Sequence, residues 1–583
     1  MILDTSPIDP RNAPTVLHAV LARARNEPDR VSLRHRGASG WVAIPWKEHY
    51  ARIERIAAGL AARGIGAGDR VAILGTNRPE WMIADLAILA LRAASVPIYP
   101  NNIPDQVRYI ASHARCKGIV VFGPEQWAKV APWAAELPVV VYSGHVTPVG
   151  AVALADLERE GAARVGGEFS LEEAIRRVEP GDLATVVYTS GTTAHPKGVM
   201  LTHANAVWQA RAVLEVLPMD GEETISFLPL SHIAERLQGE LFNPIAGNVV
   251  SFAQSFQTVL MDLLEVRPTT LTCVPRMWEK IHEGISRKIA RQSPIARRLF
   301  TWALQVGARA AAYRTAGRRV PLALALRSAT ADRLVFSRVR RGLGMDRCRI
   351  FISGGAPLEK SLVEFFSAMG MDIHEVYGMT ETFGSICFPP RGRIKPGTVG
   401  PPLPGLELRL DEDGEILVRG GNVFSGYWDD SEATRDAFAD DWLRTGDVGA
   451  IDPDGYVAIL DRREDLIVTS GGSNVAPAPI ENRLKTIPGV DQALVVGHRR
   501  RHVAALIFPT AEALKAGAGA LERAVAEGVE RINRDLAPYA RVRRFRVLAR
   551  PASVETGELT PTLKVKRRVV EERFAAEIEA IYE

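Results

Sequence analysis

A loop rich in hydroxyl side chains is the first segment of this sequence that could do chemistry. Residues 188–198 read Tyr-Thr-Ser-Gly-Thr-Thr-Ala-His-Pro-Lys-Gly; they follow an apolar run from Leu183 and precede a helical pattern over 202–215. Backbone N–H groups, hydroxyl groups and the ammonium of Lys197 together offer donors to a polyanion. The segment lacks the Gly-x-x-x-x-Gly-Lys-Ser/Thr order of a Walker A loop. Its order and length favour a phosphate-binding loop over a Ser/Thr-rich surface turn.

This loop resembles the signature of the adenylate-forming superfamily, which includes acyl-CoA synthetases, luciferases and the adenylation domains of peptide synthetases. The superfamily signature looks like Tyr-Thr-Ser-Gly-Thr-Thr-Gly-x-Pro-Lys-Gly, and Ala194 replaces the second glycine. An alanine stiffens the loop if a positive φ is needed there. The resemblance implies that the phosphates of ATP bind Thr189, Ser190, Gly191, Thr192, Thr193 and Lys197.

Three motifs in the middle of the chain resemble those of the same superfamily. The segment Phe-Leu-Pro-Leu-Ser-His-Ile-Ala-Glu-Arg over 227–236 implies that His232 lies near the acyl site. The segment Ser-Gly-Gly-Ala-Pro over 353–357 resembles the strand and turn on which adenine rests. The segment Tyr-Gly-Met-Thr-Glu over 377–381 resembles a motif whose threonine contacts phosphate and whose glutamate holds magnesium, here Thr380 and Glu381. The further ATP contacts implied in this region are Gly355, Ala356, Pro357, Glu375, Tyr377, Gly378 and Met379.

The C-terminal third continues the resemblance in the same order. The segment Trp-Leu-Arg-Thr-Gly-Asp ends at Asp447, which the resemblance assigns to the ribose hydroxyls, and Arg462 is a further nucleotide contact. Each motif alone also fits a plain structural role, such as a capped helix start or a turn, but their joint order favours the resemblance. The remaining implied positions are the hinge pivot Glu464, the loop Gly471, Gly472, Ser473 and Asn474 on the thiol's approach, and the catalytic lysine Lys564, with Lys566 as its nearby competitor.

The resemblance implies a two-step reaction. ATP first activates a carboxylic acid as an acyl-adenylate, with Mg²⁺ on Glu381, and the acyl group then passes to a thiol. The problem in the first step is charge, since an anion must approach a polyphosphate, and preorganised positive groups solve it. A hinge rotation at Glu464 would exchange Lys564 for the thiol loop over one nucleotide site.

The acid and the thiol are predicted from finer motif similarity. Residues 559–564, Leu-Thr-Pro-Thr-Leu-Lys, and residues 472–481 resemble the long-chain and "bubblegum" branches, as does a basic insertion over 284–347. These features predict a long-chain fatty acid and coenzyme A as the substrate pair. Two alternatives stay open: a fatty-acyl-AMP ligase that loads a carrier protein, and a non-catalytic lipid-binding relative.

The elements that must position these motifs alternate along the chain. Short β-branched runs over 70–74, 95–99 and 118–122 are separated by helical patterns over 80–94 and 104–114, which is typical of α/β layers with parallel strands. Short strands and a tight turn over 405–419 predict a small antiparallel unit.

The chain length calls for more than one domain. With 583 residues, the chain exceeds the size at which a single core stops growing. We predict a large α/β N-terminal domain over 1–461 that contains the adenylate-forming site and the small antiparallel β unit. The charged cluster over 461–465 then leads into a smaller, mobile α+β domain over 462–583 that carries the catalytic lysine.

Composition excludes several classes of protein. An apolar fraction of 46% and a charged fraction of 24% are those of a folded protein rather than a disordered one. The four cysteines lie far apart without a Cys-x-x-Cys pair, so neither a disulfide framework nor a zinc site is predicted, and a reducing cytoplasm fits best. The N-terminus lacks the pattern of a secretory signal, and no run approaches the roughly 20 apolar residues that span a bilayer.

The basic insertion has a local excess of positive charge that the net charge of the whole chain, only +4, does not show. Residues 284–347 hold 15 Lys or Arg and two acids. The plainest interpretation is a set of basic helices packed on the body by one face. A second is an attachment surface for anionic lipid, which would bring the protein to a membrane from one side. Nucleic acid is disfavoured because no binding motif accompanies the charge.

Overall fold

The structure is a computed structural model and describes residues 9–189, 196–255, 257–554, 556–560 and 564–583. A seven-stranded sheet with the order β7-β6-β5-β3-β4-β8-β9 forms one half of the N-terminal body. All its strand pairs are parallel except that β9 runs antiparallel to β8. The strands are β3 (Arg70–Leu74), β4 (Ala94–Ile98), β5 (Gly118–Phe122), β6 (Val139–Ser143), β7 (Val152–Ala153), β8 (Leu183–Thr189) and β9 (Lys197–Thr202).

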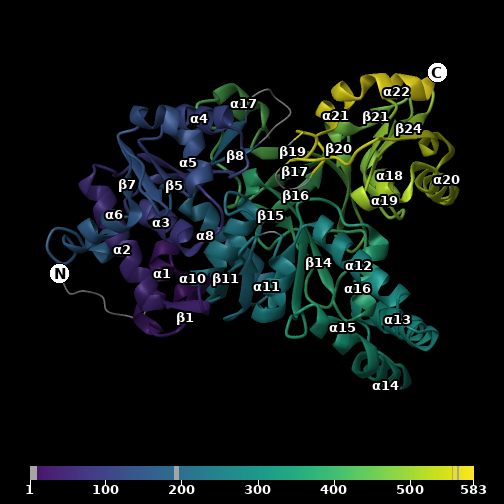
Figure 1. Ribbon diagram of the computed structural model, residues 1–583, viewed down its shortest axis with the longest axis horizontal. Helices are drawn as coiled ribbons and strands as arrows, with labels where there is room; N and C mark the ends of the chain where they lie inside the picture. Colours follow the sequence, from purple (N-terminus) through teal and green to yellow (C-terminus); the bar gives the residue numbers. More distant parts are fainter. Residues whose placement is uncertain (1–8, 190–195, 256, 555, 561–563) are drawn as a thin grey trace.

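Helices cover both faces of this sheet (Figure 1). Successive residues of a strand point to opposite faces, so Val71 and Ile73 of β3 join one core while Ala72 and Leu74 join another. Both cores are apolar, which explains why these strands are continuous apolar runs. The predicted α/β layers are confirmed. The helices of this half are α1 (Val16–Asn26), α2 (Trp46–Ala62), α3 (Pro79–Ala90), α4 (Pro104–His113), α5 (Pro124–Val130), α6 (Leu154–Ala162), α7 (Leu171–Arg176) and α8 (His203–Val216).

Two four-stranded sheets form the rest of the α/β body. One has the order β10-β11-β1-β2 and the other the order β12-β13-β14-β15. In the second, β12, β13 and β14 are parallel, so their carboxyl ends lie at one edge. The strands are β1 (Val31–Gly37), β2 (Gly40–Pro45), β10 (Glu223–Ser226), β11 (Val249–Phe252), β12 (Thr270–Cys273), β13 (Ile350–Gly354), β14 (Ile373–Met379) and β15 (Gly384–Cys387).

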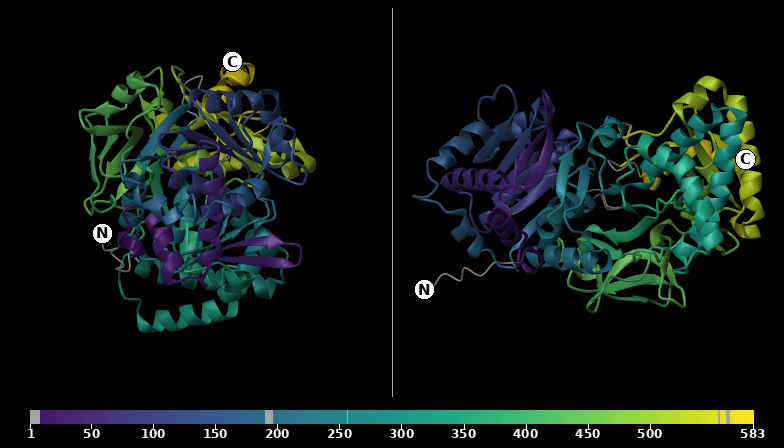
Figure 2. Two further views of the ribbon diagram at one scale, coloured as in Figure 1. Left: turned by 90° about the vertical axis from the view of Figure 1, so that its left-hand side faces the viewer. Right: turned by 90° about the horizontal axis from the view of Figure 1, so that it is seen from below.

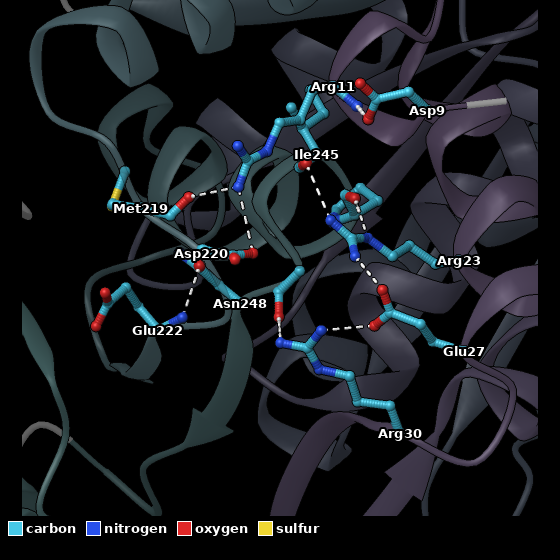
Figure 3. Close-up of polar contacts among 12 residues, drawn as sticks. Asp9, Arg11, Arg23, Glu27, Arg30, Met219, Asp220, Glu222, Ile245 and Asn248 are labelled. Atoms are coloured by element: carbon cyan, nitrogen blue, oxygen red, sulfur yellow. Dashed lines mark hydrogen bonds and ion pairs between the residues drawn. The ribbon is translucent and has the colours of Figure 1, made fainter.

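A buried arginine fastens the first helix of the body to a helix more than two hundred residues later. Arg23 donates from Nε to the carbonyl of Pro244 at 2.9 Å and from Nη2 to that of Ile245 at 3.2 Å, near the end of α10 (Phe242–Ala246). Figure 3 shows its guanidinium between Ile245 and Glu27. A cation here satisfies carbonyls that a helix C-terminus leaves without partners.

The basic insertion forms helices on the far side of the second four-stranded sheet. Trp278 is fully buried there and packs edge-on against Phe351 and Phe366. Figure 1 places α13 and α14 at the lower margin of the molecule. The helices of this region are α11 (Val259–Val266), α12 (Pro275–Ala290), α13 (Pro294–Thr315), α14 (Leu322–Ala331), α15 (Ser337–Gly342) and α16 (Lys360–Ala368).

A small antiparallel sheet links the body to the last part of the chain. It contains β16 (Glu407–Leu410), β17 (Glu415–Arg419), β18 (Phe438–Ala439), β19 (Trp442–Ile451) and β20 (Val457–Arg462), with α17 (Ser431–Asp436) between β17 and β18. The predicted antiparallel unit over 405–419 is the β16–β17 hairpin. Strand β20 ends at Arg462, and the predicted domain boundary between residues 461 and 462 stays a prediction.

The residues after β20 have their own cores at one end of the long axis (Figures 1 and 2). Two apolar clusters there consist only of residues from Ile467 onward, and no cluster of the described residues joins them to the body. No described helix has the length and apolarity to cross a membrane. The elements are β21 (Ile467–Val468), β22 (Asn474–Val475), β23 (Val490–Val496), β24 (Val503–Pro509), β25 (Val542–Val547), α18 (Pro477–Leu484), α19 (Ala511–Ala516), α20 (Ala518–Arg534), α21 (Arg567–Arg573) and α22 (Ala575–Tyr582).

Candidate active site

The hydroxyl-rich loop connects two paired strands. Strand β8 ends at Thr189 and β9 begins at Lys197, and these two residues are partners across the antiparallel pair. Both ends of the loop are therefore fixed by the seven-stranded sheet. The ammonium of Lys197 lies 5.1 Å from the centre of the Tyr427 ring, within range of a cation–π interaction. The predicted phosphate contacts Ser190, Gly191, Thr192 and Thr193 lie outside the described residues.

Glu381 lies in a short 3₁₀ turn (Thr380–Thr382) directly after β14. Its carboxylate is buried, and Oε1 accepts a hydrogen bond of 2.9 Å from the Tyr427 hydroxyl. Burial raises the pKa of Glu381, and hydrogen bonds from its own N–H and from Tyr427 oppose that shift. In the same turn, the carbonyl of Thr380 accepts the N–H of Phe383 at 3.0 Å.

Glu381 could hold a metal only together with a ligand. No group of three or more His, Cys, Asp or Glu side chains suited to a metal exists among the described residues. Mg²⁺ often binds through one or two protein carboxylates plus the phosphates of a nucleotide. One buried carboxylate beside a phosphate-type loop fits that mode of binding.

Asp447 is held between two donors at the point where β19 pairs with β20. The Tyr377 hydroxyl donates to Oδ2 at 2.6 Å, and Nε of Arg462 lies 2.8 Å from Oδ1. Asp447 and Arg462 are also register partners across these strands. Burial raises the pKa of Asp447, while Arg462 and Tyr377 favour its charged form. This buried carboxylate is thus oriented before any ligand arrives.

Lys564 reaches this cluster from the C-terminal domain. Its pKa is lowered to about 8 by burial and by the charge of Arg462, and Asp447 acts in the opposite direction. The residue as a whole is exposed to solvent, whereas burial of the ammonium itself is what lowers its pKa. The backbone of Lys564 is fixed by Thr560, since the N–H of Thr560 donates to its carbonyl at 2.7 Å and its own N–H donates to Oγ1 at 3.0 Å.

His232 lies in the N-terminal body, near enough to Lys564 for the charge of the lysine to act on it. Its Nδ1 accepts the N–H of Ala234 at 3.1 Å at the start of a helical turn, and its ring meets that of Tyr99 edge-on at 6.4 Å. The pKa of His232 is lowered to about 4 by burial and by the positive charge of Lys564. The imidazole is therefore neutral at pH 7 and can contact an uncharged chain or accept a hydrogen bond.

The predicted adenine contacts lie at the carboxyl ends of β13 and β14. Gly355 has a φ of +84°, and a Cβ added there would meet no atom within 4 Å, so the turn presents bare backbone to open space. Glu375 accepts the N–H of Leu358 at 2.9 Å, and burial raises its pKa to about 7. Ligands of α/β sheets commonly bind at such strand ends. Ala356 and Pro357 follow Gly355 in this turn, and Gly378 and Met379 end β14.

The residues predicted to form the thiol loop and the pivot lie in the C-terminal part of the chain. Glu464 is in a 3₁₀ turn (Arg463–Asp465), and its charge acts on Arg462. The hairpin between β21 and β22 has Gly472 at its tip with a φ of +76°. No hydrogen bond or ion pair that joins two described residues connects Gly471, Gly472, Ser473 or Asn474 to Glu381, Asp447 or Lys564.

Two features of this region were absent from the sequence-based prediction. One is Tyr427, which touches both Lys197 and Glu381; only the Gly-Tyr-Trp sequence of residues 426–428 marks it, and this fits any tight turn. The other is a pair of salt bridges between the domains, formed by Arg276 with Asp491 and by Lys485 with Glu279.

Comparison with protein families and curated proteins gives matches over the whole length. The model of the AMP-binding enzyme family matches residues 20–428, and that of the AMP-binding enzyme C-terminal domain matches residues 464–583. The long-chain-fatty-acid–CoA ligase FadD15 of Mycobacterium bovis is 38% identical over 97% of this chain and 96% of its own. The long-chain-fatty-acid–CoA ligase ACSBG2 of Gallus gallus is 30% identical over 98% of this chain and 81% of its own.

Solved structures share the fold. ATP-bound MatB from Rhodopseudomonas palustris is 26% identical, with a TM-score of 0.72 over 98% of this chain and all (100%) of its own. The adenylation domain of a carboxylate reductase from Mycobacterium chelonae has a TM-score of 0.76 at 23% identity, over 98% of this chain and 92% of its own. The chain therefore shares its overall fold with both of these structures.

Proposed function

Because the chain belongs to the AMP-binding enzyme family, we propose that it activates a long-chain fatty acid with ATP and transfers the acyl group to coenzyme A. The full-length relatives named as long-chain-fatty-acid–CoA ligases support both the acid and the thiol. The observation that carries the proposal is that Lys564 of the C-terminal domain lies near enough to Asp447 and Arg462 of the body, themselves an ion pair, for both charges to act on its pKa. This is the constellation that the first half-reaction needs.

In the first half-reaction, a carboxylate oxygen attacks the α-phosphorus of ATP. The bond from that phosphorus to the bridging oxygen breaks, and pyrophosphate leaves with its electron pair. Lys564 and Lys197 would offset negative charge on the phosphates, while Asp447, already oriented by Tyr377 and Arg462, would accept the ribose hydroxyls. Such preorganised charge is the main source of catalysis at phosphorus, and no protein nucleophile is required.

The site also suits a divalent cation. Glu381 would hold Mg²⁺ jointly with the nucleotide phosphates, and the ion when bound would neutralise phosphate charge. The residues around it act on the carboxylate itself, because Tyr427 fixes one of its oxygens.

The second half-reaction requires a different arrangement. The sulfur of coenzyme A attacks the acyl carbonyl carbon, the carbon–oxygen bond to AMP breaks, and AMP leaves. We assign residues 1–461 and 462–583 to two domains that rotate at Glu464, so that the loop at Gly471 replaces Lys564 beside the nucleotide. The ion pair of Arg276 with Asp491 joins the two domains through polar groups, which supports a contact that can form and break reversibly.

The decisive experiment is fatty-acid-dependent exchange of pyrophosphate into ATP, measured with a panel of acids from acetate to about C20. Exchange with the long acids supports the proposal, and exchange with short or aromatic acids alone refutes the substrate class. Thioester formation from coenzyme A and from acyl carrier protein is measured in parallel. Preference for the carrier protein would favour a carrier-loading ligase, and absence of exchange with every acid would favour a non-catalytic relative.

The proposal also includes one-sided contact of this cytoplasmic enzyme with anionic membrane through α14. Leu322 and Leu326 lie on one face of this helix and are 78% and 64% exposed. Arg327 and Arg333 follow nearby and form no ion pair with another described residue. An exposed apolar stripe flanked by cations suits the surface of an anionic bilayer.

Flotation with liposomes tests this contact. We expect binding to vesicles that contain phosphatidylglycerol and not to phosphatidylcholine alone, and we expect Leu322→Ser with Leu326→Ser to abolish it. Equal binding by the double variant would contradict the assignment of α14.

A further inference from the structure

We propose that Tyr427 is a positioning residue that holds the carboxylate of Glu381 and the ammonium of Lys197 in one arrangement for metal–ATP. This inference rests on the proposed adenylating function and deepens it. Tyr427 is the side chain that touches both groups, one through its hydroxyl and the other through its ring.

The hydroxyl contact fixes the orientation of the carboxylate. The Tyr427 O–H donates to Oε1 of Glu381 at 2.9 Å, and the carboxylate is buried, so few other donors compete. A hydrogen bond to an ionised acceptor is stronger than one between neutral groups. With Oε1 held in this way, the other oxygen faces a ligand in one orientation. Partners of this kind tune metal-binding carboxylates elsewhere.

The ring contact fixes the ammonium. The Nζ atom of Lys197 lies 5.1 Å from the centre of the Tyr427 ring. The ring of Phe424 packs against the ring of Tyr427, with the two ring centres 4.9 Å apart and the ring planes at 68°. This contact limits rotation of the tyrosine side chain. The flexible side chain of Lys197 therefore has a preferred position next to the ring of Tyr427.

The backbone on either side of Tyr427 is tied to the same two parts of the site. The N–H of Phe424 donates to the carbonyl of Glu381 at 2.8 Å. The N–H of Met200 donates to the carbonyl of Gly426 at 3.0 Å, and Trp428 donates to Gly198 at 2.7 Å. The segment thus bridges β9, which leaves the phosphate loop, and the turn that carries Glu381. A shift of either part would move the tyrosine.

Tyr456 provides a matched control within the same chain. Its hydroxyl donates to the carbonyl of Arg393 at 2.9 Å, and the Nζ atom of Lys395 lies 4.4 Å from its ring. It therefore has the same two kinds of contact, but with residues outside the proposed site. Tyr456→Phe measures what loss of such a hydroxyl does to the fold alone.

The test measures metal binding without turnover. Binding of Mn²⁺ in the presence of α,β-methylene-ATP is followed by the electron paramagnetic resonance signal of free Mn²⁺ in the wild type, Tyr427→Phe and Tyr456→Phe. We expect Tyr427→Phe to weaken Mn²⁺ binding by about tenfold, because loss of an outer partner of a metal ligand typically costs 10- to 100-fold. Tyr427→Leu also removes the aromatic ring, so it should in addition weaken binding of the nucleotide analogue in the absence of metal.

The outcomes separate the roles. Weaker Mn²⁺ binding by Tyr427→Phe with an unchanged Tyr456→Phe supports the inference. Equal Mn²⁺ affinity in the wild type and both variants overturns it, as does equal weakening in both variants, which would mean a purely structural effect. Failure of the wild type to exchange pyrophosphate with any acid would sink the proposed function instead, and the metal-binding comparison would still report on Tyr427.

Discussion

We expect Lys564 to set a pH limit on the proposed first half-reaction. Its pKa falls from 10.5 to about 8, because burial and the charge of Arg462 disfavour the ammonium more than Asp447 favours it. In the proposed role the ammonium is the form that offsets phosphate charge, so we expect activity to be present below pH 8 and to be lost as the pH rises. At pH 9, about one tenth of Lys564 molecules carry the charge, compared with about 97% for a lysine of ordinary pKa.

The assay is ATP–pyrophosphate exchange, with kcat/KM for ATP measured from pH 6 to 10. This parameter reports the free enzyme, to which the pKa of about 8 applies. We expect it to fall about tenfold per pH unit above that value. In Lys564→Arg the guanidinium stays protonated, so the alkaline fall should disappear even if the plateau is lower. Lys566→Ala is the control, because Lys566 lies two residues away and should leave the profile unchanged.

The half-reactions give a second and independent readout. Lys564→Ala should abolish adenylate formation in a single-turnover assay but spare thioester formation from supplied acyl-AMP and coenzyme A. The reasoning is refuted if the two half-reactions fall equally, or if the alkaline fall near pH 8 persists in Lys564→Arg.

Three further perturbations follow from the described contacts. Arg276→Glu should slow single-turnover adenylation about fivefold by placing like charges at Asp491, and a compensating Asp491→Arg should restore it; equal rates would contradict the role of this pair. Asp85→Ala removes one of the two buried carboxylates that pair with Arg236, the one at 2.6 Å, and leaves Glu240 at 3.0 Å. It should lower the free energy of unfolding in urea by about 3–5 kcal/mol, and a loss below about 1 kcal/mol, as for a surface pair, would refute this. Glu558 is buried, yet hydrogen bonds from Arg side chains hold its pKa at about 2; Glu558→Gln should therefore be less stable at neutral pH, and the difference should vanish as the pH falls from 4.5 toward 2 in thermal melts.

Much of the fold follows from local pattern. The predicted strands over 70–74 and 118–122 coincide with β3 and β5, because short apolar runs between turn residues leave one interpretation. The predicted helix over 80–94 ends earlier, at Ala90, because Arg92 adopts a φ of +56° and the chain enters β4 at Ala94. Strand β9 escaped prediction because it begins with Lys197 and Gly198, which read as part of the loop.

The residues of the candidate site also differ in whether local sequence predicts them. Glu381, Asp447 and Lys564 are identified by short motifs, since each has a fixed local spacing to its neighbours. Tyr427 has no such spacing, because its partners lie 46 residues earlier at Glu381 and far earlier still at Lys197. Contacts that depend on how distant strands meet leave little trace in one sequence.

The separation of apolar cores near Arg462 has a consequence for the proposed rotation of the two domains. Each domain has its own apolar core. The contact between the domains includes two ion pairs, Arg276 with Asp491 and Lys485 with Glu279. Because no apolar cluster of the described residues joins the two domains, we expect their separation at this contact to expose little apolar surface. The heat-capacity change of the rearrangement should then be small, and its equilibrium should depend weakly on temperature. The side chains of these two ion pairs are only 12–18% exposed, so added salt should screen them less than surface pairs and should shift the balance between the two half-reactions only modestly.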